Sequence, residues 1–551
     1  MRRIIGIGVI LLFATLAVFL SEQSQVSLAS NQIAPDNTVL YIEIPHLVQT
    51  QRKLPDTALY EIFQEPSFRR FLKQPASNLS KEYQSSWDSF LNLGCTALFF
   101  CATDPSRQRW MAGFQSSANT TVRTREIQNI CKRIFGCDAI HISLARSDRV
   151  RVADDGTGIF FTELGRWTVL SRDRDLLEES LKNAGSGKNA GSGAGGLFSS
   201  KLFQECRSNI RPAYDLLLFA RGSPSLTVAS GVVWEFDNEQ TPGSPRAVMA
   251  STTIEGARLR DTIFTCTSPK ESDEPLSRQG LAMTSAKTIG YLASRLELSK
   301  LWRLSDQFSA DWPVAATLRD YIGQTRSAGV EPADLDHLVT GAEIVIDQNP
   351  ASEFLAPAIL LKVTDRTKFQ QLMDRIVREK LPDSCRLSSI EGVPAYILSP
   401  NENASIVFGL VDQKLLIARD ESIFAEMVRR LRTSHEGLER DHQFKETEGL
   451  VAAPSDLFLY IDAKAGFQKI YDATRPMLIF GAAMIPALNR YVDAMAFPET
   501  AEIVRHLSPI VLSRHRVRKG FIDESVGPLT AYEAAAFVVG SAVAVGSLQR
   551  Q

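Results

Sequence analysis

The sequence lacks an excess of charge of either sign. Its 551 residues contain 61 basic and 63 acidic side chains, for a formal net charge of -2. Such a chain has no global field that attracts a polyanion, so nucleic acid is not expected as a partner. Hydrophobic residues make up 44% and charged residues 23% of the chain, which is typical of a folded globular protein. At this length we expect about two to four domains.

The motifs of common catalytic and metal sites are also lacking. No C-x-x-C, H-E-x-x-H or G-x-S-x-G occurs, which removes the simplest redox, zinc and hydrolase interpretations. The glycine-rich stretch at residues 183–196 fails the phosphate-loop pattern, because Asn189 follows Lys188 where Ser or Thr is needed. We predict that this stretch is a flexible loop. The sequence nominates no catalytic residue, no metal ligand and no cofactor.

Cysteine is sparse, and its number is odd. An odd count leaves at least one thiol free. Cys95 and Cys101 fall in one predicted strand, where they are about 20 Å apart and cannot bridge each other. We expect mostly buried, small apolar side chains, with one disulfide allowed. The seven cysteines are Cys95, Cys101, Cys131, Cys137, Cys206, Cys266 and Cys385.

The N-terminus is typical of an exported protein. Met1, Arg2 and Arg3 precede an apolar run at residues 4–20, and a polar segment with small residues follows. This is the pattern of a signal peptide, and an uncleaved membrane anchor is the alternative. In both cases the bulk of the chain is expected in the periplasm, or anchored in the membrane and facing the periplasm.

Internal similarity is the most informative feature that is present. The stretch FTELGRWTVLSRD resembles FGLVDQKLLIARD, with Phe161 over Phe408 and Asp173 over Asp420 at the same offset of 247. Further matches follow in the same order, and the offset drifts only by small gaps. The pattern predicts two related halves produced by an internal duplication.

Each half alternates apolar, β-rich runs with amphipathic helical segments. This alternation predicts an α+β fold with a mainly antiparallel sheet and packed amphipathic helices. A hairpin-like segment late in each half turns at glycine, and Gly256 aligns with Gly520. The predicted divisions are a signal peptide or anchor at residues 1–29, a first half at 30–275, a second half at 276–530 and an apolar tail at 531–551.

Three arginines in the last hairpin are the candidate binding residues. On a strand, Arg514, Arg516 and Arg518 project from one face, where they could hold an anionic sugar, phosphate or lipid headgroup. The alternative is that the returning strand neutralises them. With a turn at Lys519–Gly520, Arg516 would face Asp523.

The C-terminal tail is the second apolar segment. Its uncharged part, residues 534–548, is about 22 Å long as a helix, which is short for the hydrocarbon core of a bilayer. The tail either docks on the protein or contacts a membrane or a partner helix. Membrane contact is thus expected, if anywhere, through residues 4–20 or 534–548.

Four stretches carry a resemblance to a known family: APDNTVLYIEIPHL, YEIFQEPSFRRFL, RDESIFAEMVRRL and SRHRVRKGFIDESVGPL. The chain resembles an uncharacterised family of exported bacterial proteins of unknown function, of the planctomycete type. The resemblance covers most of the mature chain. It implies location and architecture, and it brings no active-site residues.

The leading hypothesis is an exported, envelope-associated, non-catalytic protein that binds or scaffolds an unknown envelope component. One alternative is an exported hydrolase of envelope polymers. Another is a carrier of an apolar ligand between the two halves.

Overall fold

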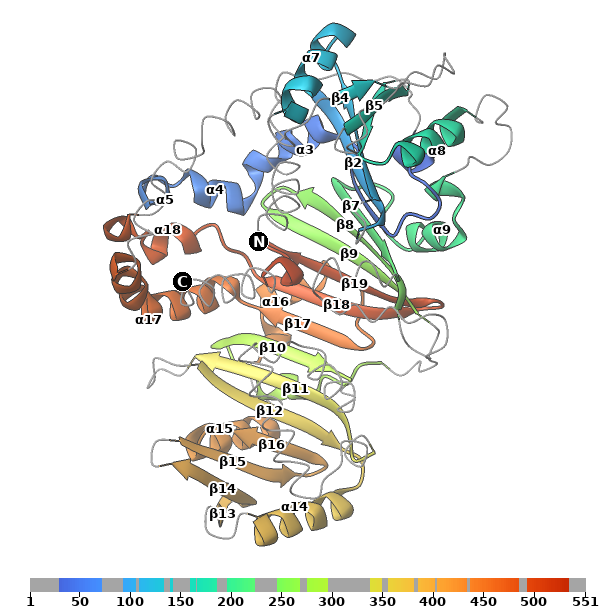
Figure 1. The fold of residues 1–551 in the computed structure, drawn as a ribbon. Helices are drawn as coiled ribbons and strands as arrows, with labels where there is room; N and C mark the ends of the chain where they lie inside the picture. The colour runs from blue at the N-terminus through green and yellow to red at the C-terminus, as the bar shows by residue number, and fades with distance from the viewer. Residues whose placement is uncertain are drawn as a thin grey trace. The chain divides into compact units, whose positions relative to one another are not determined.

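The chain forms two compact units (Figure 1). The predicted signal segment, most of the glycine-rich stretch and the tail from residue 535 lie outside the described residues. Unit 1 lies within residues 1–270, 481–498 and 517–522, and unit 2 within 271–480, 499–516 and 523–551. The computed structural model describes residues 29–71, 93–105, 109–132, 139–141, 159–164, 166–185, 196–222, 245–267, 275–295, 337–348, 355–380, 385–401, 404–433, 437–484 and 493–534.

Unit 1 is built on a mainly antiparallel sheet. Neighbouring strands pair in the order β4-β5-β6-β3-β2-β1-β7-β8-β9, in which β4 and β5 run parallel. The strands are β1 (Leu40–Ile44), β2 (Cys95–Asp104), β3 (Arg109–Ser116), β4 (Ala139–His141), β5 (Ile159–Leu164), β6 (Trp167–Ser171), β7 (Leu216–Arg221), β8 (Pro245–Glu255) and β9 (Arg258–Thr267).

Alternation along β2 explains how this sheet is covered on one face. Cys95, Phe99 and Cys101 are buried, because every second side chain of a strand points to the same face. The ring of Phe99 lies over Gly113 of β3, where a Cβ atom would come within 2.1 Å of Phe99 Cε1. The glycine therefore makes room for an aromatic side chain in the core.

In unit 1, helices alternate with the strands along the chain and pack on the sheet. Asn119, Asp173 and Ser200 cap the N-termini of three of them, each accepting a hydrogen bond from a backbone N–H three residues further on. The helices are α2 (Ser30–Ile33), α3 (Leu47–Lys53), α4 (Ala58–Gln64), α5 (Pro66–Phe71), α7 (Thr120–Ile130), α8 (Arg174–Gly185) and α9 (Lys201–Arg207), with short 3-10 turns at η2 (Leu54–Asp56), η5 (Leu197–Ser199) and η9 (Ala494–Ala496).

Unit 2 has an antiparallel sheet of similar order. Its strands pair as β13-β14-β15-β16-β12-β11-β10-β17-β18. The strands are β10 (Thr288–Ser294), β11 (Val339–Gln348), β12 (Leu355–Val363), β13 (Cys385–Ile390), β14 (Val393–Asn401), β15 (Ala404–Val411), β16 (Lys414–Ala418), β17 (Leu457–Ile461) and β18 (Ile510–Val517). The last strand of the chain, β19 (Gly520–Gly527), has its first three residues in unit 1 and the others in unit 2.

The helices of unit 2 begin at similar caps. Asp365, Asp420 and Asp441 cap α14, α15 and α16 by accepting a backbone N–H three residues on. The helices are α14 (Arg366–Lys380), α15 (Glu421–Arg432), α16 (His442–Glu448), α17 (Ala463–Met484) and α18 (Thr500–Val504), with 3-10 turns at η6 (Gln279–Met283) and η7 (Leu438–Arg440). The last four residues of α17, from Gly481, belong to unit 1.

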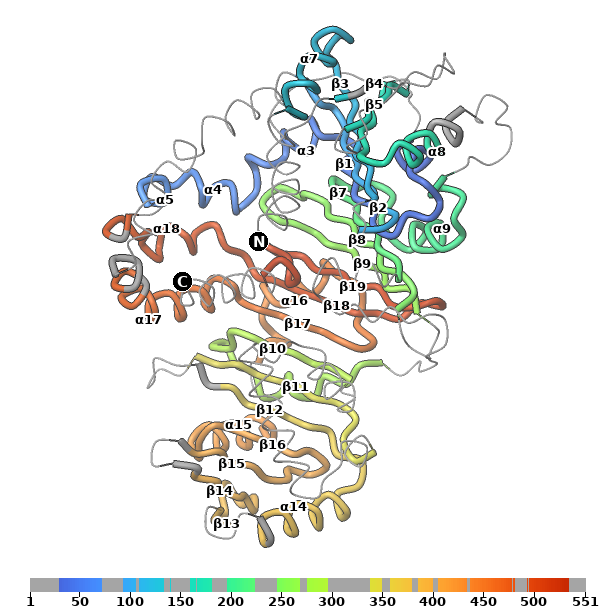
Figure 2. Tube along the Cα trace, viewed as in Figure 1, coloured from blue at the N-terminus to red at the C-terminus, as the bar shows by residue number. Residues whose placement is uncertain are grey.

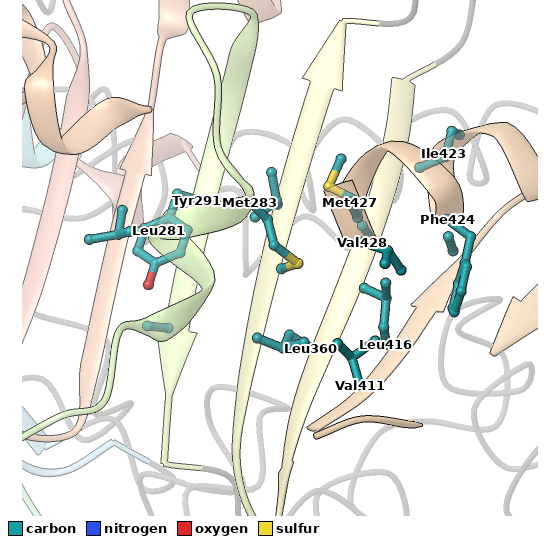
Figure 3. Close-up of a cluster of buried hydrophobic side chains, with 14 of the residues drawn as sticks. Leu281, Met283, Tyr291, Leu360, Val411, Leu416, Ile423, Phe424, Met427 and Val428 are labelled. Carbon is teal, nitrogen blue, oxygen red and sulfur yellow. The ribbon is translucent and has the colours of Figure 1, made fainter. Parts of the chain in front are cut away.

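The main core of unit 2 lies between α15 and the sheet. The Cα trace in Figure 2 places α15 against β12, β15 and β16. Figure 3 shows apolar side chains from η6, from the strands and from α15 gathered in this cluster. Met283, Leu416 and Phe424 are fully buried there. Burying such side chains stabilises the fold by about 1.5–3 kcal/mol each relative to exposing them.

These observations confirm the predicted α+β fold with a mainly antiparallel sheet and packed helices. The run β5-β6-β3-β2-β1-β7-β8 in unit 1 has the same order as β15-β16-β12-β11-β10-β17-β18 in unit 2. Between corresponding strands, α7, α8 and α9 occupy the places of α14, α15 and α16.

Gly256 and Gly520, which the internal similarity aligns, occupy different positions in their hairpins. The β8–β9 turn is Gly256–Ala257, whereas the β18–β19 turn is Arg518–Lys519 and Gly520 follows it. Gly256 has a φ of 63°, the left-handed region that favours glycine. Gly520 instead begins β19, where a Cβ atom would lie 2.0 Å from the carbonyl oxygen of Thr265. Gly256 is therefore required by its backbone conformation, and Gly520 by the close approach of another strand.

Candidate functional site: the arginines of β18 and the apolar face of α17

Arg514 is held by a carboxylate of the neighbouring strand. Its Nε and Nη2 lie 2.6 Å and 2.8 Å from the two carboxylate oxygens of Asp523, which is 3% exposed. The hydroxyl of Tyr532 donates to Asp523 Oδ2 at 2.5 Å. Burial alone would lower the pKa of Arg514, but the hydrogen bonds and charge of Asp523 outweigh it and raise the pKa above its usual value. Arg514 is thus a fixed cation within unit 2.

Arg516 is paired with a different carboxylate. Its Nε and Nη2 lie 2.6 Å and 2.8 Å from the carboxylate oxygens of Asp456, the residue before β17. Its backbone N–H donates to Ser455 Oγ at 2.9 Å. Arg295 also approaches Asp456, at 3.9 Å. The guanidinium of Arg516 therefore joins β18 to the start of β17.

The third arginine does not lie on the strand. β18 ends at Val517, and Arg518 is exposed in the turn with Lys519. The expected cross-strand pair of Arg516 with Asp523 is replaced by Arg514 with Asp523, because the turn at Arg518–Lys519 lies one residue earlier than predicted and therefore moves the partner of Asp523 by two residues. Anion binding by the three arginines stays a prediction.

A second feature, on α17, was not anticipated from the sequence. Ile470, Met477 and Phe480 are 53%, 74% and 68% exposed. With Ala473, they are separated by three, four and three residues, so they lie along one side of the helix. We refer to these four residues as the α17 stripe. Exposed apolar side chains in such a row are unusual on a soluble surface and mark an interaction site.

The rest of α17 explains why the stripe points outward. Asp462 caps the helix by accepting the N–H of Ala465 at 3.0 Å. Gly466, near the start, packs on Ile289, with a Cβ position only 3.0 Å from Ile289 Cγ2. Phe467 and Tyr471, one turn apart, stack with ring centroids 4.9 Å apart. The first turns of α17 are thus fixed to unit 2, and the helix extends leftward from the strands in Figure 1.

Charge on α17 is predominantly positive. The helix contains Lys464, Lys469 and Arg475, against one acidic residue, Asp472. From Met477 to Met484 its sequence, MLIFGAAM, has no charge at all. This combination of an apolar row with basic residues is typical of helices that lie at a membrane surface. Among the described helices, none is both long enough and apolar enough to cross a membrane.

Other exposed apolar residues are scattered. Leu387 on β13 is 64% exposed, and Met495 in η9 of unit 1 is 87% exposed. Single exposed side chains of this kind are ordinary. Sequence reasoning missed the α17 stripe because apolar residues at helical spacing predict a buried face. The uncharged run after Pro476 was the available signal.

One buried carboxylate could have suggested acid–base chemistry. Burial raises the pKa of Glu343 above its usual value. Its Oε2, however, accepts the hydroxyl of Tyr291 at 2.5 Å and the backbone N–H of Gly280 at 2.7 Å. These hydrogen bonds join η6 to β10 and β11, so the contacts of Glu343 are structural.

Comparison with known proteins gives no family. No family model and no curated protein matches the chain. Among solved structures, crystal form III of TP0453 has a TM-score of 0.23 and 11% identity, over 47% of this chain and 80% of that chain. Crystal form I of TP0453 has a TM-score of 0.16 and 8% identity, over 74% and 100% of the two chains. Likenesses this distant carry no functional argument.

Proposed function

We propose that this chain is an exported, envelope-associated, non-catalytic binding protein that rests α17 on the surface of a lipid membrane. The observation that carries the proposal is the row of exposed Ile470, Met477 and Phe480 on one side of a helix whose first turns are fixed to unit 2. Water contact with these side chains is unfavourable, and a bilayer interface would remove it.

The favoured occupant is a lipid surface. Three basic residues against one acidic residue give α17 a charge that complements anionic headgroups. Transfer of apolar area at about 25 cal/mol per Å² makes each stripe side chain worth about 1 kcal/mol or more at the interface.

Export is the second part of the proposal. The basic residues Arg2 and Arg3 and the apolar run at residues 4–20 support it, since this is the order of a signal peptide. Export would bring the folded units to the envelope, where a membrane surface is always within reach.

Internal duplication is the third part. Phe161 faces Leu170 across β5 and β6, and Phe408 faces Ile417 across β15 and β16, so both pairs keep the offset of 247. The equal strand orders and helix caps of the two units support a common origin of the halves.

Vesicle binding tests whether α17 rests on a membrane. The processed chain, with its N-terminus confirmed by mass spectrometry, is sedimented with vesicles of phosphatidylethanolamine and phosphatidylglycerol. We expect the triple variant Ile470→Gln, Met477→Gln, Phe480→Gln to lose roughly tenfold or more of the binding. The matched control Leu387→Gln removes a similarly exposed apolar side chain from β13 and should bind as the wild type does.

Equal sedimentation of the triple variant and the wild type would contradict the proposal. So would a wild-type chain that stays in the supernatant at every vesicle concentration, which would direct attention to a protein partner of the stripe.

A further inference from the structure

Two cysteines of unit 1 are paired in space although they are distant in sequence. Cys206 lies on α9 and Cys266 on β9, and both side chains are fully buried in the same apolar cluster. Glu205, the residue before Cys206 on α9, accepts the thiol of Cys266 at 3.3 Å, which brings the two cysteines close together. Both are free cysteines, so two neighbouring thiols are built into the packing of α9 on β9.

Charged groups surround this pair on one side. Arg246 of β8 donates through Nη2 to Cys266 Sγ at 3.0 Å. The thiol of Cys266 donates to Glu205 Oε1 at 3.3 Å. Lys519 Nζ lies 3.0 Å from Glu205 Oε2. The guanidinium of Arg246 favours the thiolate of Cys266, whereas the hydrogen bond to Glu205 and the charge of Glu205 oppose its ionisation.

The pKa values of the two thiols consequently shift in opposite directions. The hydrogen bond from Cys206 lowers the pKa of Cys266, and Arg246 acts in the same direction. That same hydrogen bond, together with burial, raises the pKa of Cys206. By contrast, burial raises the pKa of Cys95 and of Cys101 to about 12, which makes those two thiols poor nucleophiles.

We propose that Cys206 and Cys266 form a redox site, which a small hydroperoxide converts into a disulfide that joins α9 to β9. Glu205 accepts the thiol proton of Cys266, and Arg246 stabilises the thiolate. The thiolate attacks one peroxide oxygen: an S–O bond forms, the O–O bond breaks, and the leaving alkoxide or hydroxide takes the proton from Glu205.

The second step closes the pair. The sulfur of Cys206 attacks the sulfenic sulfur of Cys266, an S–S bond forms, and the S–O bond breaks with loss of water that carries the Cys206 proton. Two thiols and one hydroperoxide yield one disulfide, one alcohol or water, and one further water. The two electrons lost by the sulfurs reduce the peroxide.

Peptide mapping tests the site in the full chain. The reduced protein is treated with hydrogen peroxide, alkylated after denaturation without reductant, and digested. We expect a linked peptide that contains Cys206 and Cys266 to accumulate and to disappear after reduction. Cys101, buried without such neighbours, is the internal control and should stay alkylatable.

Two variants test whether Arg246 promotes disulfide formation or whether closeness of the two cysteines is sufficient. Arg246→Gln removes the cation beside Cys266 and should slow disulfide formation roughly tenfold. The control Arg211→Gln removes a similarly exposed arginine that pairs with Glu255 and should leave the rate unchanged. Should Arg246→Gln fail to fold, Cys206→Ser provides the second measurement, because the sulfenic acid left on Cys266 should then react with dimedone.

Recovery of Cys206 and Cys266 as separate alkylated peptides, in the same proportion as Cys101, would overturn the proposal. A disulfide that forms at the same rate in Arg246→Gln as in the wild type would overturn the role given to the charged groups.

Discussion

At the scale of single residues, the ion pair of Arg514 with Asp523 shows how a predicted binding residue can have a structural role. The carboxylate is almost fully buried, and both of its oxygens receive hydrogen bonds from the guanidinium. Removing one member leaves the other charge desolvated without a partner, which costs more than the pair itself contributes.

We therefore expect Asp523→Ala to lower the free energy of unfolding by about 3 kcal/mol. Urea unfolding followed by circular dichroism measures it. Arg518→Ala, at the exposed turn, is the control and should change stability by no more than about 0.5 kcal/mol. A loss below about 1 kcal/mol for Asp523→Ala would mean that the pair contributes little.

Glu343 predicts a pH dependence. Its pKa is higher in the folded chain than the usual 4.5, so the folded state holds its proton over an interval in which the unfolded state has lost it. The contribution of Glu343 to stability is therefore present below pH 4.5 and is lost as pH rises through the raised pKa. Glu343→Gln, which keeps an acceptor for Gly280 and Tyr291, should lack this loss.

The measurement is the urea midpoint of both proteins from about pH 4 to about pH 8. The stability of the wild type relative to Glu343→Gln should fall with rising pH and then level off. A constant difference between the two curves would show that Glu343 does not change its protonation in this range.

At the scale of elements, matching caps begin the matching helices. Asp173 accepts the N–H of Leu176 at the start of α8, and Asp420 accepts that of Ile423 at the start of α15. Asp173 also forms an ion pair with Arg109, whose Nε lies 2.5 Å from Asp173 Oδ2. Asp420 therefore caps a helix, whereas Asp173 caps a helix and also forms an ion pair with Arg109 of β3.

We expect Asp420→Ala to cost about 1 kcal/mol, the usual value for a lost N-cap, and Asp173→Ala to cost more. Thermal unfolding measures both. Asn at either position keeps the cap oxygen and should recover most of the loss at Asp420, but less at Asp173, where the charge also pairs with Arg109. Equal recovery at the two positions would contradict this division.

Periodicity in the sequence predicted the elements well, because strand alternation and helical amphipathicity are local. The predicted amphipathic helical segments between the strands are present, for example as α8 and α15. The α17 stripe could not be predicted this way. An apolar row at helical spacing looks the same whether the fold covers it or leaves it exposed.

The same limit explains the arginines and the cysteines. Whether Arg514 or Arg516 meets Asp523 depends on a one-residue choice of turn, which the residues near Gly520 leave open. Cys206 and Cys266 meet only because α9 packs on β8 and β9, and spacing in the sequence contains no information about that contact.

At the scale of the whole molecule, the two units share the order of seven strands but differ in the features on which the two proposals depend. Unit 1 has the thiol pair with its charged neighbours, and unit 2 has the α17 stripe. The α+β scaffold itself fixes no function. The proposed activities therefore depend on the thiol pair and the α17 stripe.

The most direct test of membrane contact uses two native methionines of the wild-type chain. Met477 lies in the α17 stripe, and Met495 lies in η9 and is similarly exposed. Peroxide converts exposed methionine to its sulfoxide, and mass spectrometry of peptides gives the rate at each position with and without phosphatidylethanolamine–phosphatidylglycerol vesicles. We predict that vesicles slow oxidation of Met477 severalfold and leave Met495 unchanged. Oxidation of Met477 at the same rate in both conditions would contradict the placement of α17 on a membrane.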